Sequence, residues 1–330
     1  MQGILVLGEL DQNGLASVTG ELLSLARSLA DETGDQVSVS LQGASVGSEA
    51  DDAVAMGADT VYKVESPLLG EPQIDAHLSA LEQVARHTDP SIVLVGRTPI
   101  GRDVGPRLAF RLGAAVAQDC VEVSVNSDTG RILATRPVYG GNALASVSFS
   151  GDGVQVVIVR PKTVEAGEPD SDRSGTIEDF SADLDDSAIK ARLIETVSQE
   201  SEGVRLEDAG IVVSGGRGLG GPEPFEQLQA LSDLLGGALG ASRAACDAGW
   251  IDHSHQVGLT GKTITPDLYI TIGISGASQH MAGCSASKNI VAINRDEDAN
   301  IFKSATYGVV GDWTKVLPSF IETIRELRDS

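Results

Sequence analysis

Polar side chains flanked by glycines follow several apolar runs in the last third of the chain. One apolar run, Leu268 to Ile274, ends at a Gly-Ser turn and is followed by ASQH, which ends in His280. An earlier stretch, QVGLT, places Gln256 and Thr260 around a glycine. Amide, hydroxyl and imidazole groups can hydrogen-bond a polar ligand, and glycine lets the backbone approach it closely. The pattern therefore indicates a ligand-binding site.

Two arginines add positive charge to this part of the chain. Arg217 lies inside the turn GGRGLGG, and Arg243 follows Ser242 after another run of small residues. An arginine flanked by glycines can donate two hydrogen bonds to the oxygens of a phosphate. A solvated loop arginine would have the same sequence pattern. One such residue decides little, but two indicate an anionic ligand.

The glycine turn itself matches G-x-G-x-x-G through Gly216, Gly218 and Gly221, between a predicted strand and a predicted helix. That is the position of the Rossmann phosphate loop. However, Glu223 and Glu226 fall in the first turn of the helix, where they would repel a pyrophosphate. We therefore expect the turn not to be a classical NAD loop.

His280 stands at the predicted start of a helix, where the helix dipole disfavours an imidazolium and favours a neutral ring. No serine or cysteine with a matching motif accompanies it, so hydrolase chemistry is poorly supported. Two further predicted strands end in Asn294 and Asp312. Because strand carboxyl ends converge in an open α/β sheet, we expect these polar groups to share one crevice.

The elements that would position this site belong to a second α/β unit. In the first part of the chain, strands such as ILVLGEL and SIVLVGR alternate with helical patterns such as IDAHLSALEQVARH. This alternation predicts a mostly parallel sheet. The segments CVEVSV, RILATRPVYGG, ALASVSFS and VQVVIVR then follow with turn signals between them, and we expect them to form an antiparallel extension of the same sheet.

The boundary between the units is predicted near residue 203. Residues 165–186 are acidic and rich in Gly, Ser and Pro, which predicts an exposed linker. The segment 188–197, AIKARLIETV, alternates like one more strand of the first sheet. A fresh α/β pattern begins at DAGIVVSGG. We thus expect an N-terminal α/β domain over 1–202 and a Rossmann-like doubly wound domain over 203–330.

The charge excludes one class of partner. The chain carries 47 acidic and 24 basic residues, a net charge of -23, and only seven of its bases are lysines. Nucleic-acid binding needs a basic footprint, so we expect none. An acidic, lysine-poor chain instead suggests a protein from a high-salt habitat, because salt screens its self-repulsion.

Cysteine usage and apolar run lengths exclude other classes. Cys120, Cys246 and Cys284 lack paired CxxC spacing, which indicates buried thiols rather than a disulfide framework or a zinc site. No apolar run is long enough to span a membrane, and the N-terminus has neither a basic flank nor a cleavage site. We therefore expect a cytoplasmic protein without membrane insertion.

These segments resemble, in order and spacing, the alpha subunit of electron-transfer flavoproteins. The resemblance rests on VVSGGRGL, GASRAACDAGW, QVGLTGKTITPDLYITIGISGASQHMAG, IVAINRD and YGVVGDWTKVLP in the second unit. In the first unit, GRDVGPRLAFRLGAAVAQD and RPVYGGNALA are similar to family motifs. The resemblance covers nearly the whole chain.

The resemblance implies a heterodimer with a smaller beta subunit, and FAD carried mainly by the second domain. The implied FAD-binding residues are Arg217, Ser242, Arg243, Gln256, Val257, Gly258, Leu259, Thr260, Ser275, Gly276, Ala277, Ser278, Gln279, His280, Asn294, Asp312 and Trp313.

Within this set the resemblance implies separate roles. Arg217 and Ser242 would contact the ADP side and Arg243 the isoalloxazine ring, with Thr260 near N5 and His280 near the C2 oxygen. One-electron reduction puts negative charge on the N1 and C2-oxygen side, so a donor and a fixed cation there would stabilise it.

The remaining residues would hold the rest of the dinucleotide. The loop 275–280 would bind ribityl and pyrophosphate, and Asn294 and Asp312 the adenosine end, where Trp313 replaces a commonly aliphatic residue.

The implied function is that of an electron carrier rather than an enzyme with its own substrate. It would take electrons from flavoprotein dehydrogenases, such as the acyl-CoA dehydrogenases of fatty acid β-oxidation, and pass them to a membrane quinone oxidoreductase. Two alternatives stay open at this point. One is the alpha subunit of a complex that bifurcates electrons from NADH, and the other is a non-redox nucleotide-binding protein.

Overall fold

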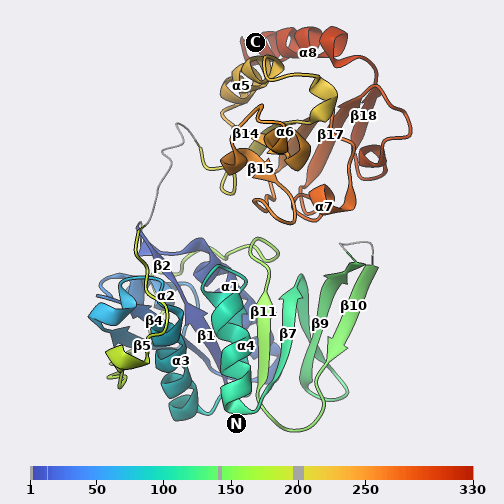
Figure 1. Ribbon diagram of the computed structural model, residues 1–330. Helices are drawn as coiled ribbons and strands as arrows, with labels where there is room; N and C mark the ends of the chain where they lie inside the picture. Colours follow the sequence, from blue (N-terminus) through green and yellow to red (C-terminus); the bar gives the residue numbers. More distant parts are fainter. Residues whose placement is uncertain (1–2, 13, 140–142, 196–203, 330) are drawn as a thin grey trace. The chain divides into compact units, whose positions relative to one another are not determined.

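The chain divides into two compact units. The computed structural model describes residues 3–12, 14–139, 143–195 and 204–329. Residues 1–137 and 144–197 form the first unit, and residues 138–143 and 198–330 the second (Figure 1). The boundary predicted at 202/203 falls on residues 196–203, outside the described part of the chain, and stays a prediction.

A parallel sheet forms the centre of the first unit. Its strands, in sheet order, are β12 (Thr176–Asp179), β5 (Thr60–Glu65), β4 (Val37–Gly43), β1 (Ile4–Gly8), β6 (Ile92–Gly96), β11 (Gln155–Val159) and β7 (Ala115–Cys120). Side chains of β1 alternate between two cores: Ile4 and Val6 pack on one face, and Leu5 and Leu7 on the other. A strand buried on both faces needs an unbroken apolar run, which β1 has.

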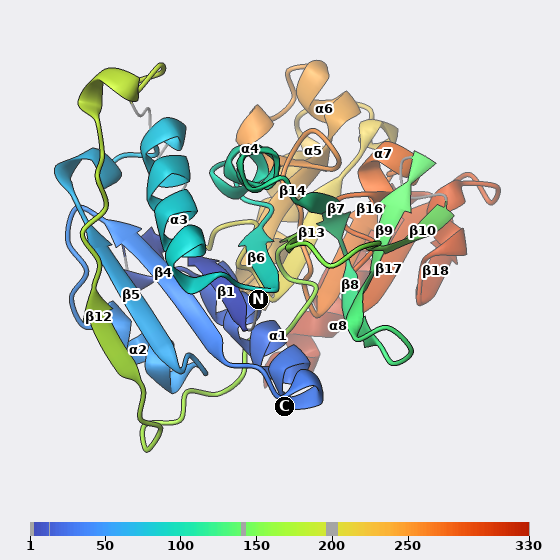
Figure 2. The same cartoon turned by 90° about the horizontal axis from the view of Figure 1, so that it is seen from below.

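Helices cover both faces of this sheet, as Figure 2 shows. Helices α1 (Ser17–Thr33) and α2 (Glu49–Ala55) pack on one face, and α3 (Ile74–Thr88) and α4 (Gly101–Leu112) on the other. Short 3-10 turns lie at η1 (Pro67–Leu69) and η3 (Asp186–Ala188). The predicted alternation of strands and helices is confirmed.

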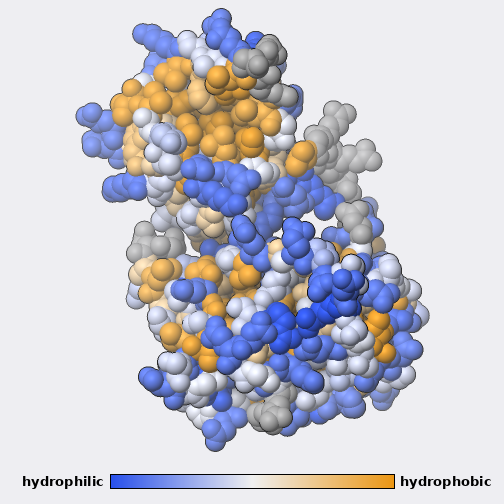
Figure 3. All heavy atoms as spheres, turned by 180° about the vertical axis from the view of Figure 1, so that it is seen from behind, coloured by the Kyte–Doolittle hydropathy of each residue, from blue (hydrophilic) through white to orange (hydrophobic). Residues whose placement is uncertain are grey.

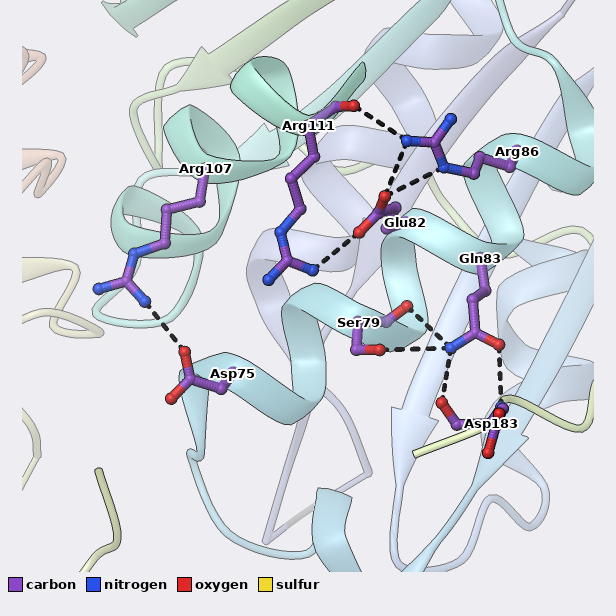
Figure 4. Close-up of polar contacts among 8 residues, drawn as sticks. All are labelled: Asp75, Ser79, Glu82, Gln83, Arg86, Arg107, Arg111 and Asp183. Carbon is purple, nitrogen blue, oxygen red and sulfur yellow. Dashed lines mark hydrogen bonds and ion pairs between the residues drawn. The ribbon is translucent and has the colours of Figure 1, made fainter. Parts of the chain in front are cut away.

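Charged side chains tie α3 to α4, and an uncharged one, Gln83, ties α3 to the segment that follows β12 (Figure 4). Glu82 of α3 pairs with Arg86 at 2.8 Å and with Arg111 of α4 at 2.7 Å. Hydrogen bonds from these two arginines hold the pKa of Glu82 below its usual value, against the effect of its burial. Gln83 exchanges two hydrogen bonds of 2.9 Å with the backbone of Asp183. The segment around residue 183 is thus fixed against α3.

The antiparallel strands are present, but they form a sheet of their own. This sheet contains β8 (Glu122–Asn126), β9 (Arg131–Val138) and β10 (Ala143–Ser148), while β2 (Leu10–Asp11) and β3 (Gly14–Leu15) form a short separate pair. The segment VQVVIVR, predicted to belong to the antiparallel part, is instead β11 and runs parallel between β6 and β7. All five residues of β11 are buried, as a strand covered on both faces requires.

The predicted linker contains the edge strand of the first sheet. β12 lies within 165–186 and pairs in parallel with β5, whereas residues 189–195, predicted as a strand, form none. Residues 196 and 197 of that prediction fall outside the described part. All four residues of β12 are exposed, so it lacks the apolar alternation by which a strand is found in a sequence.

The second unit has one parallel sheet with the strand order of a Rossmann fold. Its strands are β15 (Gln256–Val257), β14 (Ala238–Ser242), β13 (Ile211–Gly215), β16 (Leu268–Ile272), β17 (Asn289–Asn294) and β18 (Tyr307–Val310), in that order. In sequence order this is 3-2-1-4-5-6, so the direction of winding reverses between β13 and β16. The predicted doubly wound fold is confirmed.

The two faces of this second sheet are covered differently. Helices α5 (Pro224–Leu235), α6 (Arg243–Asp247) and α8 (Trp313–Asp329) pack on one face around Leu228 and Ile270. The short helix α7 (Ser278–Met281) and the loops around Ile264 and Ile301 cover the other. Short 3-10 turns lie at η4 (Arg217–Leu219), η5 (His253–His255) and η6 (Asn300–Lys303).

Candidate functional site

All predicted binding residues lie at the carboxyl ends of the strands of the second sheet or in the segments that follow them. In an open α/β sheet this edge holds the ligand, at the point where the winding reverses. Here that point lies between the loops that follow β13 and β16. The predicted convergence of the polar segments on one edge therefore agrees with the strand order.

The glycine turn after β13 is packed against the loop after β16. The amide of Gly216 donates to the carbonyl of Ile272 at 2.8 Å, and that of Gly218 donates to the carbonyl of Gly273 at 3.0 Å. A Cβ at either glycine would collide with the backbone of Gly273. These glycines serve a close approach of two loops, and the two amides are already used. This gives a physical reason, beyond the two glutamates, why the turn should not act as a phosphate loop.

The QVGLT loop rests directly on α7 and the residues after it. The amide of Leu259 donates to the carbonyl of Gln279 at 2.7 Å. Gly258 has a φ of 144°, and a Cβ on Gly283 would lie 2.6 Å from its backbone. Both positions therefore exclude larger residues. The contact brings the predicted segments 256–260 and 275–280 together.

Gln256 links two other polar side chains in this loop. It is buried, donates from Nε2 to Oγ1 of Thr260 at 3.0 Å, and its Oε1 lies 3.2 Å from Nδ1 of His253. Since the hydroxyl of Thr260 accepts this bond, its own proton is left to donate elsewhere. Thr260 is exposed, so its hydroxyl can meet a ligand.

His280 is buried beside a tyrosine that the sequence pattern did not single out. Its Nε2 lies 2.9 Å from the hydroxyl of Tyr269, and the two rings stack at 24°. Burial lowers the pKa of His280 to about 4, which the carbonyl of Val257 opposes only in part. The ring is therefore neutral at pH 7, and the cause is its burial rather than the helix dipole on which the sequence argument relied. Its Nδ1 is buried and makes no hydrogen bond of good geometry.

Ser242 and Arg243 stand where β14 passes into α6. The hydroxyl oxygen of Ser242 is buried without a hydrogen-bond partner. Arg243 is exposed and pairs with Asp247 one turn later, at 3.2 Å. Arg217, in the glycine turn, is exposed as well. Both arginines can therefore reach an anionic ligand from the protein surface.

Asn294 and the loop after β16 are held by the backbone. The side-chain amide of Asn294 donates to the carbonyl of Ile274 at 2.9 Å, and Ile301 donates to the carbonyl of Ser275 at 3.1 Å. Gly276 has a φ of 75°, and a Cβ there would collide with the backbone of Ile301. The loop 275–280 thus has a fixed path with little side-chain bulk at its start.

Asp312 and Trp313 have local structural roles that the sequence pattern did not reveal. Asp312 caps α8: it accepts from the hydroxyl of Thr314 at 2.7 Å and from its amide at 3.0 Å, and both bonds lower its pKa. Trp313 packs against the core between α5 and the sheet. Contact of either residue with a ligand stays a prediction.

Other predicted exclusions concern metals, thiols and membranes. Within the described ranges no cluster of His, Cys, Asp and Glu is arranged to hold a metal ion. All three cysteines are free and buried, as predicted. No helix among the described residues is long and apolar enough to cross a membrane.

Family models cover most of the chain. A model described as "Electron transfer flavoprotein domain" matches residues 4–185, and one described as "Electron transfer flavoprotein FAD-binding domain" matches residues 205–285. Among solved structures, a putative UDP-N-acetylglucosamine 2-epimerase from Listeria monocytogenes matches with a TM-score of 0.34 at 11% identity, over 99% of this chain and 89% of its own. No argument rests on that likeness.

Three curated relatives named "Electron transfer flavoprotein subunit alpha" match over nearly their full length. The protein from Thermoanaerobacterium thermosaccharolyticum is 43% identical over 98% of both chains. That from Megasphaera elsdenii is 42% identical, over 98% of this chain and 97% of its own. That from Bacillus subtilis is 41% identical over 98% of both. The chain belongs to the family of electron transfer flavoprotein alpha subunits.

Proposed function

We propose that this chain binds FAD at the carboxyl edge of its second sheet and works as a one-electron carrier together with a beta subunit. The observation that carries the proposal is a pair of unsatisfied donors, one at the carboxyl end of β14 and one in the segment after β16. Nδ1 of His280 and the hydroxyl of Ser242 are buried without good partners, and a ligand with acceptor oxygens would satisfy both. The match of residues 205–285 to an FAD-binding domain supports the identity of the ligand.

The donors fit the two ends of a flavin dinucleotide. Arg217 and Ser242 would hold the ADP part, because a guanidinium and a hydroxyl both hydrogen-bond phosphate oxygens. Ser275 to His280 would follow the ribityl chain and pyrophosphate with backbone amides, on the path that the close contact of Gly276 with Ile301 fixes. Asn294, Asp312 and Trp313 would border the adenosine end.

The QVGLT loop would border the isoalloxazine ring. Val257, Gly258 and Leu259 supply backbone and apolar surface, and the hydroxyl of Thr260 is left to donate to an acceptor such as N5. When bound, the ring supplies the one-electron redox chemistry. Arg243 adds a fixed positive charge beside it and His280 a neutral donor, so the protein favours negative charge on the ring.

A beta subunit is the partner that the family implies. An exposed apolar surface on the second unit supports a partner of some kind, and Figure 3 shows it from behind. Edge strand β18 contributes Tyr307, Val309 and Val310, which are 39–68% exposed, and α8 contributes Leu327. An exposed apolar edge strand can pair with other chains and cause aggregation. A partner subunit that covers the strand prevents this.

We infer that the electrons come from flavoprotein dehydrogenases, such as the acyl-CoA dehydrogenases of fatty acid β-oxidation, and pass to a membrane quinone oxidoreductase. The alternative that the family leaves open is bifurcation of electrons from NADH, which would require a second flavin in the complex. A cytoplasmic location and a high-salt habitat complete the proposal. The habitat is supported by the net charge of -23 and the scarcity of lysine.

The test is co-expression of the chain with its beta subunit, followed by a visible spectrum and a reductive titration with dithionite. The proposal expects a flavin absorbance band and reduction in two resolved one-electron steps. One flavin per complex supports the simple carrier, and two support bifurcation. A complex without flavin absorbance would contradict the proposal and favour a non-redox nucleotide-binding protein.

A further inference from the structure

Tyr269 is the one tyrosine in the second unit that lies in the middle of a buried strand. It is fully buried in β16, between the apolar residues Leu268 and Ile270. A buried tyrosine hydroxyl requires a hydrogen-bond partner. The partner here is Nε2 of His280, at 2.9 Å. The hydroxyl of Tyr269 and the ring of His280 thus form a buried pair beside the predicted flavin site.

The proton positions in this pair follow from the two ionisation states. Burial raises the pKa of Tyr269 well above its usual value, so the hydroxyl keeps its proton. The ring of His280 is neutral at pH 7 and carries one proton, on either Nε2 or Nδ1. The bond to Tyr269 can form in either direction, and the direction decides which ring nitrogen holds the proton.

The surroundings of the Tyr269 hydroxyl distinguish these directions. If Nε2 donated to Tyr269, the tyrosine proton would need another acceptor. The hydroxyl of Ser214 is close enough to lower the pKa of Tyr269, but it makes no hydrogen bond of good geometry. Among the described residues the hydroxyl of Tyr269 has one hydrogen-bond partner of good geometry, Nε2 of His280, so the phenol proton points to that nitrogen. Tyr269 therefore donates to Nε2, which puts the ring proton on Nδ1.

We propose that Tyr269 is a positioning residue that donates to Nε2 of His280 and holds the imidazole as the Nδ1–H tautomer, so that His280 is a hydrogen-bond donor to a carbonyl oxygen of the ligand. The inference rests on the proposed FAD function for the identity of that ligand. A histidine in the other tautomer would present a lone pair at Nδ1 and repel a carbonyl oxygen. The tyrosine therefore determines whether His280 can serve the role proposed for it.

The tautomer can be read without the flavin. The measurement is the ¹⁵N shifts of the His280 ring at pH 7.5 in histidine-labelled, FAD-free complex, identified by comparison with His280→Gln. The proposal expects the proton on Nδ1 in the wild type and a mixture of tautomers in Tyr269→Phe, which lacks only the hydroxyl. Tyr62→Phe, which removes the hydroxyl of a tyrosine on β5 of the first unit, should leave the wild-type pattern. A wild-type ring protonated on Nε2 would overturn the proposal even if Tyr269→Phe fails to fold.

FAD affinity provides the second readout. Without the hydroxyl of Tyr269, His280 is no longer held in the Nδ1–H tautomer. FAD binding should therefore weaken by roughly five- to tenfold in Tyr269→Phe. In a His280→Gln background the same change should have no further effect, because a glutamine amide donates without choosing a tautomer. An equal loss in both backgrounds would show that Tyr269 acts through packing, and would overturn the proposal. If no complex binds FAD, the proposed function fails while the tautomer measurement still decides the inference.

Discussion

Thr98 donates a hydrogen bond of 2.7 Å to the carboxyl group of Glu9, and so joins the ends of the neighbouring strands β1 and β6. Thr98 also accepts from the amide of Gly101, where α4 begins. This pair occupies the switch point of the first sheet, the place corresponding to the proposed flavin site of the second. In the first unit a buried carboxyl group of the chain itself stands at that place.

Glu9 should make the protein less stable as the pH rises. Burial raises its pKa from 4.5 to about 7, although the bond from Thr98 opposes the rise. Between these values the unfolded chain has lost the proton and the folded chain still holds it, so the free energy of unfolding falls with pH. The full loss is about 3.5 kcal/mol, at about 1.4 kcal/mol per pKa unit. Above pH 7 the contribution is constant.

Glu9→Gln tests this directly. The amide keeps an acceptor for Thr98 but cannot ionise. Urea unfolding at pH 5 and pH 8 should show a smaller decrease in stability for the variant than for the wild type. His77 and His280 have lowered pKa values, so their ionisation makes the protein more stable as the pH rises. Both histidines are present in the variant and in the wild type, so their effect cancels when the two proteins are compared. Equal decreases in the two proteins would contradict the assignment.

Arg243→Ala should lower the potential at which the flavin of the complex takes up its first electron. Removing an exposed cation beside the ring costs on the order of 1 kcal/mol of stabilisation, or about 40 mV for one electron. Arg243→Lys should retain most of the potential because it retains the charge. Arg192→Ala, which removes an arginine paired with Asp186 in the first unit, serves as the control. A dithionite titration gives the potentials, and an unchanged value in Arg243→Ala would refute the role.

Much of this site could be predicted from the sequence because its polar groups stand next to glycines at strand ends. Tyr269 was missed since the letters LYITI are typical of a buried strand, and its hydroxyl matters only through a contact eleven residues away. The hydroxyl group of Tyr269 in an otherwise apolar strand could have indicated a buried hydrogen-bond partner. The role of Gly258 and Gly283 also depends on a contact between two loops, which the sequence of neither loop shows.

Val310→Lys should weaken the association with the beta subunit. The residue is 57% exposed on β18, and a charge there would have to be buried without a partner in the complex. Co-purification of a tagged beta subunit should fall, while the alpha chain keeps its melting temperature. Ile177→Lys puts the same charge on β12, the exposed edge strand of the first unit, and is the matched control. If both variants bind the beta subunit as the wild type does, β18 is not part of the interface.

Salt should stabilise the protein strongly. With a net charge of -23, screening in molar NaCl removes much of the self-repulsion that dilute buffer leaves in place. We expect the melting temperature to rise by at least roughly 5 °C between dilute and molar salt. A neutral osmolyte such as sucrose, which does not screen charge, separates screening from a general stabilising effect. Equal melting temperatures at both salt concentrations would exclude the high-salt habitat.

The central claim is that FAD binds at the carboxyl edge of the second sheet, with His280 as a donor to its ring. The most direct test is the FAD dissociation constant and flavin potential of the complex carrying His280→Ala, compared with His87→Ala, a histidine on α3 of the first unit. The account predicts that His280→Ala binds FAD at least roughly tenfold more weakly and lowers its potential, while His87→Ala matches the wild type. If FAD affinity and potential are both unchanged in His280→Ala, the account is wrong.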